Sequence, residues 1–201
     1  MQSPAYVGLK RAFDLVVCAL CLPVLLPLMG ACILAVRLDS PGPALFTQLR
    51  TGRDGRRFRM YKFRTMVVNA EELKEQLRHL SIVPWPDFKL IDDPRITRVG
   101  RFLRKTSLDE LPQLINIVRG EMTFVGPRPT SFGAETYELW HTARLEVTPG
   151  LTGLWQVAGR NAADFDQRLR MDIDYIRRMR PTLDAFIVFR TVAAVFLRKG
   201  S

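Results

Sequence analysis

Two adjacent acids, Asp109 and Glu110, lie in a segment that is rich in cations. Arg104 precedes them by one helical turn, and Arg128 follows in the Gly-Pro-Arg-Pro sequence at 126–129. A carboxylate that must meet a phosphate group needs cations or a metal ion to offset charge repulsion. The segment therefore predicts a site that handles phosphate groups.

Helix capping offers a second explanation for the same two acids. Ser107 with Glu110, and Thr106 with Asp109, match the spacing of a capping box, and acids are favourable in the first turn of a helix. The same helix start can also bind anions and keep a carboxylate ionised. An ionised Asp109 can attack phosphorus and form an acyl phosphate. Glu110, about 100° further round the helix, can hold Mg²⁺ by one oxygen.

Other polar residues have both a functional and a structural interpretation. Arg128 lies between two prolines, which suits bidentate phosphate binding, although a loop arginine is usually only solvated. Lys62 and Arg64 alternate with aromatic residues, as on one face of a strand, where packing alone can explain them. Asp172 lies in an expected helix, where an exposed acid is the ordinary outcome.

Several motifs that would indicate other functions are missing from the sequence. It has no phosphate-binding loop of the NTPase type, no dinucleotide fingerprint, no zinc-protease helix and no zinc finger. His79 and His141 fit no pattern, so we expect no histidine base. The 201 residues suffice for one domain, and 30 basic against 20 acidic residues give a net charge of +10. That excess suits an anionic partner, such as a phosphorylated substrate, anionic lipid or nucleic acid.

An uncharged segment from Leu15 to Val36 is long enough for a bilayer core, at about 33 Å as a straight helix. A buried soluble helix or a signal peptide suits it less well. Pro23 and Pro27 favour a bend in its middle. Both flanks are basic, and positive charge marks the cytoplasmic side, so we favour a re-entrant hairpin over residues 1–40 rather than a straight span.

The remaining residues, 41–201, are expected to form one cytoplasmic, membrane-associated catalytic domain. The overall fold class is α+β and mostly helical, with the re-entrant helix-break-helix, amphipathic interfacial helices and a small β-hairpin. The expected strands are Ala44–Gln48 and Arg57–Phe63. The expected helices are Asn69–Leu80, Ile96–Lys105, Leu108–Val118, Ser131–Leu145, Phe165–Arg178 and Leu183–Leu197.

The chain resembles the bacterial monotopic phosphoglycosyl transferases, which begin the assembly of lipid-linked glycans. Six stretches carry the resemblance, in the family order and over nearly the whole chain. They are Lys10–Leu15, Phe46–Gln48, Tyr61–Met66, Thr106–Leu111, Gly126–Pro129 and Pro149–Gly153.

The resemblance implies a reaction and a set of site residues. A sugar 1-phosphate would move from a UDP-sugar to undecaprenyl phosphate with release of UMP. Asp109 would be the nucleophile that carries the phosphosugar, and Glu110 would hold Mg²⁺. The matching positions also place Lys62 or Arg64, Arg104, Arg128 and Asp172 in the active site.

The resemblance further implies a location and partners. The enzyme would lie on the cytoplasmic face of the bacterial inner membrane, in contact with phospholipid, as a monomer or a homodimer, without a nucleic acid partner. The family breaks its re-entrant helix at a Ser-Pro pair, and Leu26-Pro27 occupies that position here. Leu154–Val157 with Gly159–Asn161 resembles an exopolysaccharide subgroup and suggests UDP-glucose or UDP-galactose as donor. The chain would be either a minimal enzyme or a catalytic unit of a longer one.

Two other functions stay open from the residues alone. The first is a non-enzymatic membrane module that binds anionic lipid through its arginines. The second is a membrane anchor attached to a nucleic-acid-binding domain, which the net charge allows but which leaves the paired acids unexplained.

Overall fold

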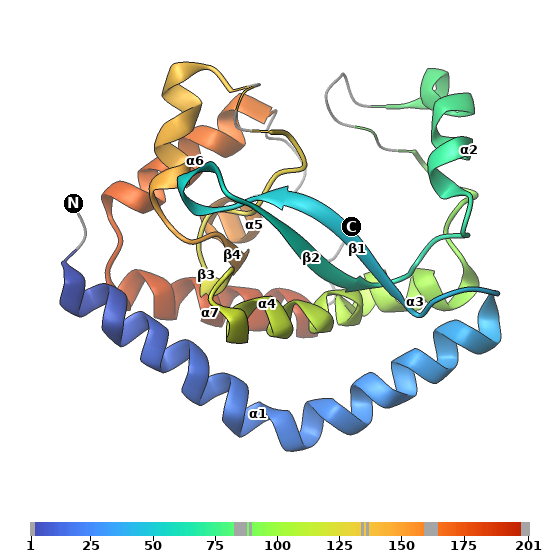
Figure 1. Cartoon of the computed structure of the whole chain (residues 1–201), viewed down its shortest axis with the longest axis horizontal. Helices are drawn as coiled ribbons and strands as arrows, with labels where there is room; N and C mark the ends of the chain where they lie inside the picture. The colour runs from blue at the N-terminus through green and yellow to red at the C-terminus, as the bar shows by residue number, and fades with distance from the viewer. Residues whose placement is uncertain are drawn as a thin grey trace.

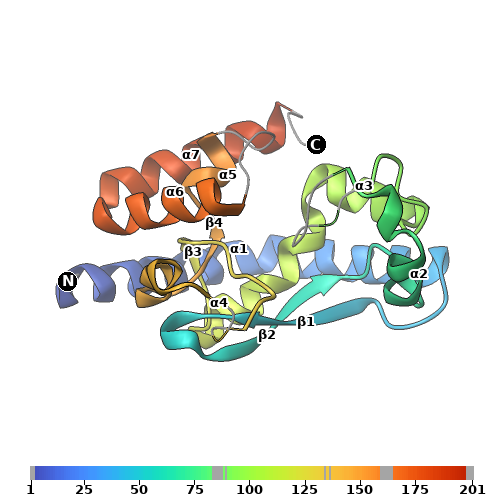
Figure 2. The same ribbon diagram turned by 90° about the horizontal axis from the view of Figure 1, so that it is seen from above.

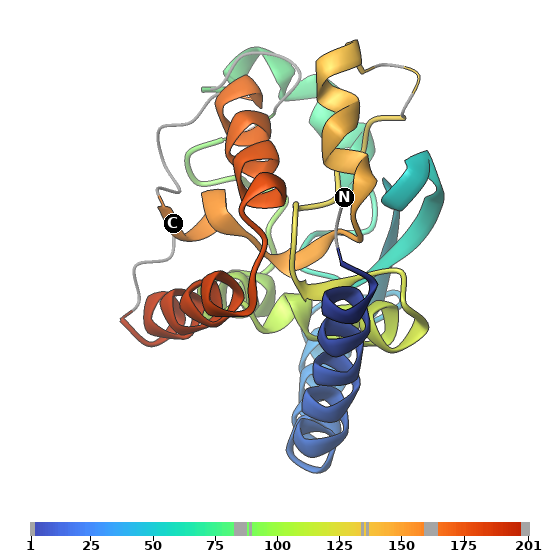
Figure 3. The same cartoon turned by 90° about the vertical axis from the view of Figure 1, so that its left-hand side faces the viewer.

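One long helix lies along one side of the molecule, and all other elements lie on its other side. The computed structural model describes residues 3–82, 88, 90–133, 135, 137–158 and 165–197. The long helix, α1, spans Pro4–Asp39. Figure 1 shows α7 (Pro181–Phe196), α4 (Leu114–Arg119) and α3 (Arg98–Thr106) in a row between α1 and the rest of the molecule. The end-on view in Figure 3 confirms that α1 projects away from the other elements.

Helix α1 is continuous, and it is bent. Pro23 and Pro27 both lie inside it, so Leu26-Pro27 does not interrupt the helix as the resemblance implied. Each proline removes one backbone hydrogen bond and favours a bend, while the neighbouring turns keep theirs. Figure 1 shows the bend near the middle, with both ends directed toward the rest of the chain. In the middle, large apolar side chains are exposed, among them Leu20 (74%) and Val24 (71%).

Both arms of α1 are attached to the same body. In the first arm, the Asp14 carboxylate accepts a hydrogen bond from Phe124 N at 3.1 Å. In the second, Asp39 Oδ2 accepts one from Val99 N at 2.9 Å. Buried apolar clusters accompany both contacts. Cys18 packs with Phe58, Met60, Ile117 and Met122, and Cys32 and Val36 pack with Ala44, Phe63 and Leu103. By length and composition, α1 is the one helix in the described part of the chain that is able to cross a membrane.

The predicted β-hairpin is present, with a longer first strand. β1 (Leu45–Thr51) pairs with β2 (Arg57–Phe63) in antiparallel register, around the short 3₁₀ turn η1 (Arg53–Gly55). Phe46 lies opposite Lys62. Because side chains alternate along a strand, Gln48 and Arg50 share the face of Phe46. The seen-from-above view in Figure 2 places the hairpin on the opposite side of α1 from α7.

The expected helix Leu108–Val118 is wrong as a single α-helix. The segment is a 3₁₀ helix, η3 (Leu108–Gln113), that continues into α4. Two features explain the difference. Ser107 has a left-handed backbone (φ 59°), which ends α3 with a sharp turn, and Pro112 lacks the N–H that an α-helix requires. The turn brings the last residues of α3 next to the first residues of η3.

A second sheet, which the sequence did not predict, holds the loop of Arg128. β3 (Thr123–Val125) pairs in parallel with β4 (Gly150–Thr152). The two backbones approach closely at Gly126 and Gly150. A Cβ on Gly150 would lie 2.1 Å from Gly126 N, and a Cβ on Gly126 would lie 2.7 Å from Thr148 O. Only glycine fits these positions, which accounts for the glycines of both sequence stretches.

The other helices match the sequence predictions to different degrees. α6 (Phe165–Arg177) and α7 confirm their predictions, and α3 begins two residues later than expected, after the N-cap Thr97. Asn69–Leu80 is divided into α2 (Ala70–Gln76) and the 3₁₀ turn η2 (Arg78–Leu80). In Ser131–Leu145, the described residues are helical mainly in the 3₁₀ helix η5 (Leu139–Glu146). A short helix, α5 (Leu154–Ala158), follows β4.

We expect Gly100→Ala to destabilise the protein, because α3 touches the chain after β2 at this residue. An added Cβ would lie 2.1 Å from Thr65 O, a backbone atom that cannot easily move. Overpacking of this kind costs about 1–3 kcal/mol. Thermal unfolding in detergent measures the loss. Gly8→Ala is the matched control, because nothing lies within 4 Å of its added Cβ. Equal melting temperatures for the two variants would show that the contact is not restrictive.

Candidate active site

The first feature of the site is an ion pair cluster around Glu110. Lys62 Nζ of β2 lies 3.1 Å from Glu110 Oε1. Arg128 donates through Nη2 to the same oxygen, and its Nη1 lies 3.5 Å from Oε2. The side chains of Lys62 and Glu110 are each 20% exposed, and that of Arg128 is 27% exposed. The hairpin, η3 and the loop after β3 thus each contribute one charged group.

Charge pairing determines the protonation of these three groups. Burial alone would raise the pKa of Glu110, but Arg128 and Lys62 outweigh burial and hold this pKa well below its usual range. Glu110 in turn raises the pKa of Arg128. Burial lowers the pKa of Lys62, and Glu110 opposes that shift. Glu110 is therefore ionised at neutral pH.

Asp109 differs from Glu110 in both contacts and pKa. Within the described part of the chain, its carboxylate accepts no hydrogen bond, and it lines a pocket with Lys62, Arg104 and Arg128. Burial raises the pKa of Asp109, and the neighbouring Glu110 adds to the rise, while Lys62 and the two arginines oppose it. The arrangement leaves an uncommitted carboxylate among cations, which can act as a nucleophile toward phosphorus.

The capping explanation for the two acids is wrong. Ser107 makes no side-chain cap, and its left-handed backbone belongs to the turn after α3. Thr106 is the last residue of α3, and its Oγ1 donates backward to Phe102 O at 2.9 Å. Glu110 contacts Lys62 and Arg128 instead of the backbone at the helix start. The capping boxes are therefore absent, although both acids lie in the first turn of a helix, η3, as expected.

Arg104 and Arg64 lie at the same pocket but have different contacts. Arg104 donates through Nε to Thr65 Oγ1 at 2.8 Å, and Asp109 is a nearby charge. Arg64 Nη2 donates to Ser40 O at 2.7 Å, and its Nη1 donates to Pro41 O. Arg64 thus holds the turn that follows α1. Of the two alternatives Lys62 and Arg64, it is Lys62 that contacts Glu110.

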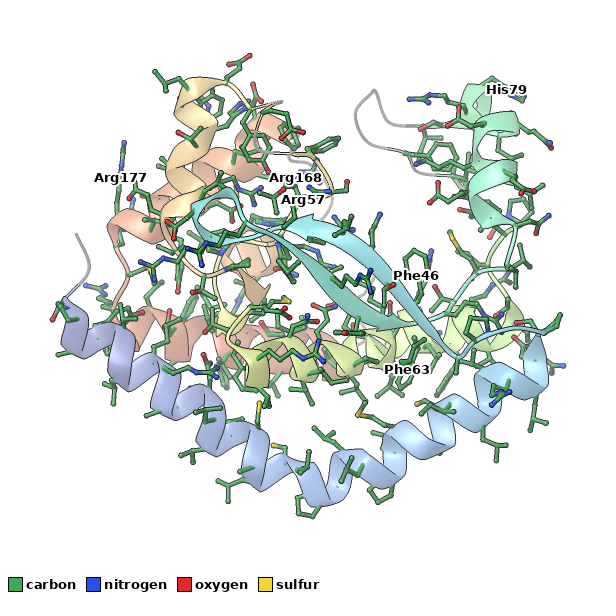
Figure 4. The ribbon with its side chains drawn as sticks, viewed as in Figure 1. Phe46, Arg57, Phe63, His79, Arg168 and Arg177 are labelled. Atoms are coloured by element: carbon green, nitrogen blue, oxygen red, sulfur yellow. The ribbon has the colours of Figure 1, made fainter. Side chains whose placement is uncertain are left out.

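The pocket at the acids has a volume of about 690 Å³ and two kinds of wall. Its polar wall contains the acids and cations just described. Its apolar wall contains Pro43, Leu45, Phe46, Phe63 and Val68. Figure 4 shows Phe46 on β1 and Phe63 at the end of β2 near α3. The arrangement suits a ligand with a charged head and an apolar tail.

A second pocket, of about 1060 Å³, adjoins the first. Gln48, Arg50, Arg104, Arg128 and Trp155 line both. It extends between α2 and α6, whose Glu71 and Arg168 also line it.

Asp172 lies in the wall of this second pocket and is only 1% exposed, so the expectation of an exposed acid is wrong. Burial raises the pKa of Asp172 to about 6, against the effect of its ion pair with Arg144.

Two arginines at the site were not predicted from the sequence. Arg50 donates to Gln48 Oε1 at 2.5 Å, and burial together with nearby Arg128 lowers its pKa to about 10. Arg144 lies 2.6 Å from Asp172 Oδ2. The alternation of Phe46, Gln48 and Arg50 along one strand face was a usable signal for Arg50. No local signal marked Arg144. His79 lies at the outer end of the α2 arm in Figure 4 and does not line either pocket.

The acids also offer a partial set of donors for a divalent cation. In the described part of the chain, no group of three or more His, Cys, Asp or Glu side chains is arranged around one point. Mg²⁺ needs fewer, since one or two carboxylates with substrate phosphates and waters suffice. Among the described residues, Glu110 Oε2 has only a 3.5 Å contact with Arg128, and Asp109 is adjacent in the chain. These oxygens fit Mg²⁺ bound together with a diphosphate.

Comparison with known proteins indicates the family of this chain independently of the site geometry. Residues 5–198 match the family described as bacterial sugar transferase. The undecaprenyl-phosphate galactose phosphotransferase of Salmonella typhimurium is 46% identical over 198 residues, which cover 96% of this chain and 41% of that protein. The UDP-glucose:undecaprenyl-phosphate glucose-1-phosphate transferase of Escherichia coli is 39% identical over 207 residues, with 96% and 41% covered.

A third relative has nearly the length of this chain. The exopolysaccharide production protein ExoY of Sinorhizobium fredii is 40% identical over 199 residues, which cover 96% of this chain and 87% of that protein. By contrast, the chain spans only 41% of the length of the Salmonella and Escherichia relatives. Residues 159–161, which contributed to the subgroup assignment, lie outside the described residues.

Proposed function

The chain belongs to the bacterial sugar transferase family, and from this membership and the site we propose that it transfers a sugar 1-phosphate from a UDP-sugar to undecaprenyl phosphate. One observation carries the proposal. The carboxylate of Asp109 is uncommitted in a pocket of cations, beside a Glu110 that Lys62 and Arg128 already neutralise. That combination suits attack on a diphosphate better than it suits lipid binding alone.

In the first step, an Asp109 oxygen attacks the phosphorus that carries the sugar. A bond forms between this oxygen and phosphorus, and the phosphorus–oxygen bond to the UMP phosphate breaks. UMP leaves with the electron pair of that bond. The product is an aspartyl phosphosugar, in which the sugar 1-phosphate is bound to the protein.

In the second step, a phosphate oxygen of undecaprenyl phosphate attacks the same phosphorus. The bond from phosphorus to Asp109 breaks, and the carboxylate is restored for another turnover. Lys62, Arg104 and Arg128 offset the repulsion between the anionic groups in both steps. Glu110 keeps Lys62 and Arg128 in place through its ion pairs.

We propose that Glu110 also holds Mg²⁺, through its oxygen Oε2, which lies 3.5 Å from Arg128 Nη1. Bound there with the diphosphate, Mg²⁺ would neutralise charge on the phosphate oxygens. Arg128 and Lys62 then orient the carboxylate, and Asp109 stays free for the attack.

The acceptor and the donor would enter from different sides. The apolar wall of the first pocket, including Phe46 and Val68, suits the prenyl end of the acceptor. The second pocket, which is lined by arginines and by Trp155, suits the nucleotide. Two relatives carry names that specify galactose and glucose, so we propose UDP-galactose or UDP-glucose as donor.

We propose that α1 is re-entrant and that the protein lies on the cytoplasmic face of the bacterial inner membrane. The attachment of both arms supports this topology, since Asp14 and Asp39 bond to one body. A straight span would carry one arm about 30 Å away, across the bilayer. The exposed apolar side chains in the middle of α1 would then lie in lipid, with the exposed Phe186 and Phe189 of α7 at the interface.

Labelling of single cysteines tests this topology. In a variant without Cys18, Cys21 and Cys32, we expect Ser3→Cys and Ser40→Cys to react with an impermeant maleimide only from the cytoplasmic side. Inverted vesicles should therefore give full labelling of both, and intact spheroplasts should give little. Labelling of Ser3→Cys in spheroplasts would identify a straight span.

The raised pKa of Asp109 predicts an acid limb in the rate profile. The nucleophile acts only when it is ionised, so the rate falls as pH falls through its pKa, by about 10-fold per pH unit. Because burial raises this pKa, the decline should begin above the ordinary aspartate value of 3.8. Single-turnover release of UMP measures the profile. A profile that is flat down to that value contradicts the assignment, and the limb should persist in Asp172→Asn.

The reaction itself is tested by release of UMP. The protein in detergent or nanodiscs is incubated with undecaprenyl phosphate, Mg²⁺ and UDP-galactose or UDP-glucose. We expect UMP and a lipid-linked sugar in equal amounts. A membrane module that only binds lipid would adsorb to anionic vesicles in a salt-dependent way and release no UMP from either donor.

A further inference from the structure

The loop that carries Arg128 is held mainly through its carbonyl groups, and the Thr130 hydroxyl also bonds to the hydroxyl of Tyr137. Two of its four residues, 127–130, are prolines, which have no N–H to donate. Each of its four carbonyls accepts a hydrogen bond from another element. In chain order, the donors are Gly150 N (2.9 Å), Arg144 Nη2 (2.6 Å), Arg50 Nη1 (3.3 Å) and Thr51 N (2.9 Å).

The bond to the carbonyl of Arg128 differs from the others in its origin. Its donor is a buried side chain, Arg144 of η5, and the same Nη2 atom donates to Asp172 Oδ2 of α6 at 2.6 Å. The side chain of Arg144 is 5% exposed and that of Asp172 is 2% exposed. Arg144 Nη1 also lies 3.4 Å from the hydroxyl of Tyr137. The buried ion pair between Arg144 of η5 and Asp172 of α6 is therefore connected by a hydrogen bond to the carbonyl oxygen of Arg128.

Neither member of this pair contacts the acids. The charges that shift the pKa of Asp109 are those of Lys62, Glu110, Arg104 and Arg128. Both side chains line the second pocket. Among the described residues, Arg144 is joined to the Arg128 loop through the carbonyl of Arg128, and Asp172 is joined to that loop through Arg144. A carbonyl fixed at this point limits the rotation of the adjoining peptide, and hence the direction in which the Arg128 side chain leaves the loop.

We propose that Arg144 and Asp172 are positioning residues that act in series on Arg128. Asp172 orients Arg144, Arg144 fixes the carbonyl of Arg128, and the guanidinium of Arg128 is thereby directed at Glu110 and the donor phosphates. This inference rests on the proposed function. It gives Asp172 a positioning role beside the predicted contact with the substrate, and it adds Arg144 to the residues on which activity depends.

A double-mutant cycle distinguishes positioning from general support of the fold. Arg144→Lys keeps the positive charge beside Asp172, but its side chain is one bond shorter, so its ammonium should not reach the position of Nη2 next to the carbonyl of Arg128. A misplacement of about 1 Å at a reacting group can cost about 10²-fold in rate, so we expect a loss of that order in kcat/KM. In the Arg128→Ala background, the same change should cost less than about 2-fold, since the group that it positions is gone.

Asp172→Asn provides a second test of the positioning role, and a matched control lies on the same helix. We expect it to lower kcat/KM and to lose its effect in the Arg128→Ala background. Asp174→Asn makes the same chemical change in an exposed ion pair with Arg178 and should leave the rate unchanged. Melting temperatures of all variants are compared, so that rates are read only from folded protein.

The outcomes separate this inference from the proposed function. Losses that multiply in the Arg128→Ala background would overturn positioning, as would unfolding of both Arg144→Lys and Asp172→Asn. Affinity for UDP-galactose and UDP-glucose, measured by calorimetry in the Asp109→Asn background, repeats the cycle without turnover. If the single variants bind the nucleotide sugars normally, or if their losses in affinity again multiply with that of Arg128→Ala, the positioning role is excluded while the proposed function stands. If the parent protein binds neither nucleotide sugar, the proposed function fails.

Discussion

Asp109→Asn is expected to abolish sugar phosphate transfer. An amide is a poor nucleophile and cannot form the acyl phosphate, so turnover should fall on the order of 10⁴-fold or more. The structure indicates that this substitution should change the reaction without changing the fold. The carboxylate accepts no hydrogen bond within the described part of the chain, so its replacement removes no packing or ion pair. The measurement is the rate of UMP release with undecaprenyl phosphate present.

The fold of the variant must be unchanged for that result to count. We expect its melting temperature to equal or exceed that of the parent, because the change removes a buried charge whose pKa burial has raised. Asp54→Asn serves as control, since Asp54 lies exposed in the hairpin turn and forms a surface ion pair with its neighbour Arg53. Transfer at the parental rate by Asp109→Asn would exclude this residue as the nucleophile.

Glu110→Gln is expected to have the second-largest effect. The substitution removes the negative charge between Lys62 and Arg128, so the two cations repel each other and lose their common partner. It also removes the charge of the proposed Mg²⁺ ligand. Loss of such preorganised electrostatics costs about 10²–10³-fold, which we expect in kcat/KM. The Mg²⁺ concentration for half-maximal rate should rise by about 10–100-fold.

The dependence on Mg²⁺ separates the two roles of Glu110. If this residue only positions Arg128 and Lys62, the rate falls and half-saturation by Mg²⁺ does not change. The matched control is Glu75→Gln, since Glu75 is exposed and forms a surface ion pair with Arg78. That change should alter neither rate nor metal dependence, because surface pairs of this kind contribute about 0–1 kcal/mol.

Elements with strong local signals were predicted well from the sequence. The uncharged stretch gave α1, the alternation around Lys62 gave β2, and the periodic patterns of α6 and α7 gave those helices nearly to the residue. The prolines predicted the bend in α1. These features depend on neighbours in the chain, so the residues contain enough information to predict them.

Features that depend on contacts between distant segments were not predicted. The pairing of β3 with β4 requires two strands of three residues each to meet across the chain, and no pattern of that length is distinctive. The helix at 108–118 was wrong as a single α-helix because Pro112 lacks the N–H that an α-helix requires there, so the first half of the segment is 3₁₀. The acids of the site were found, but the capping explanation competed with function until their contacts were known.

In the proposed reaction, Asp109 carries the sugar phosphate between donor and acceptor. This role is tested most directly by mixing the protein with UDP-galactose or UDP-glucose and Mg²⁺ without any acceptor, and following both UMP and the intact protein mass. We predict a burst of about one UMP per active site, with a matching gain of one hexose phosphate in the protein mass. Asp109→Asn should show neither the burst nor the gain in mass. Addition of undecaprenyl phosphate should return the protein to its original mass. UMP release only when the acceptor is present, with no change in protein mass, would contradict this role.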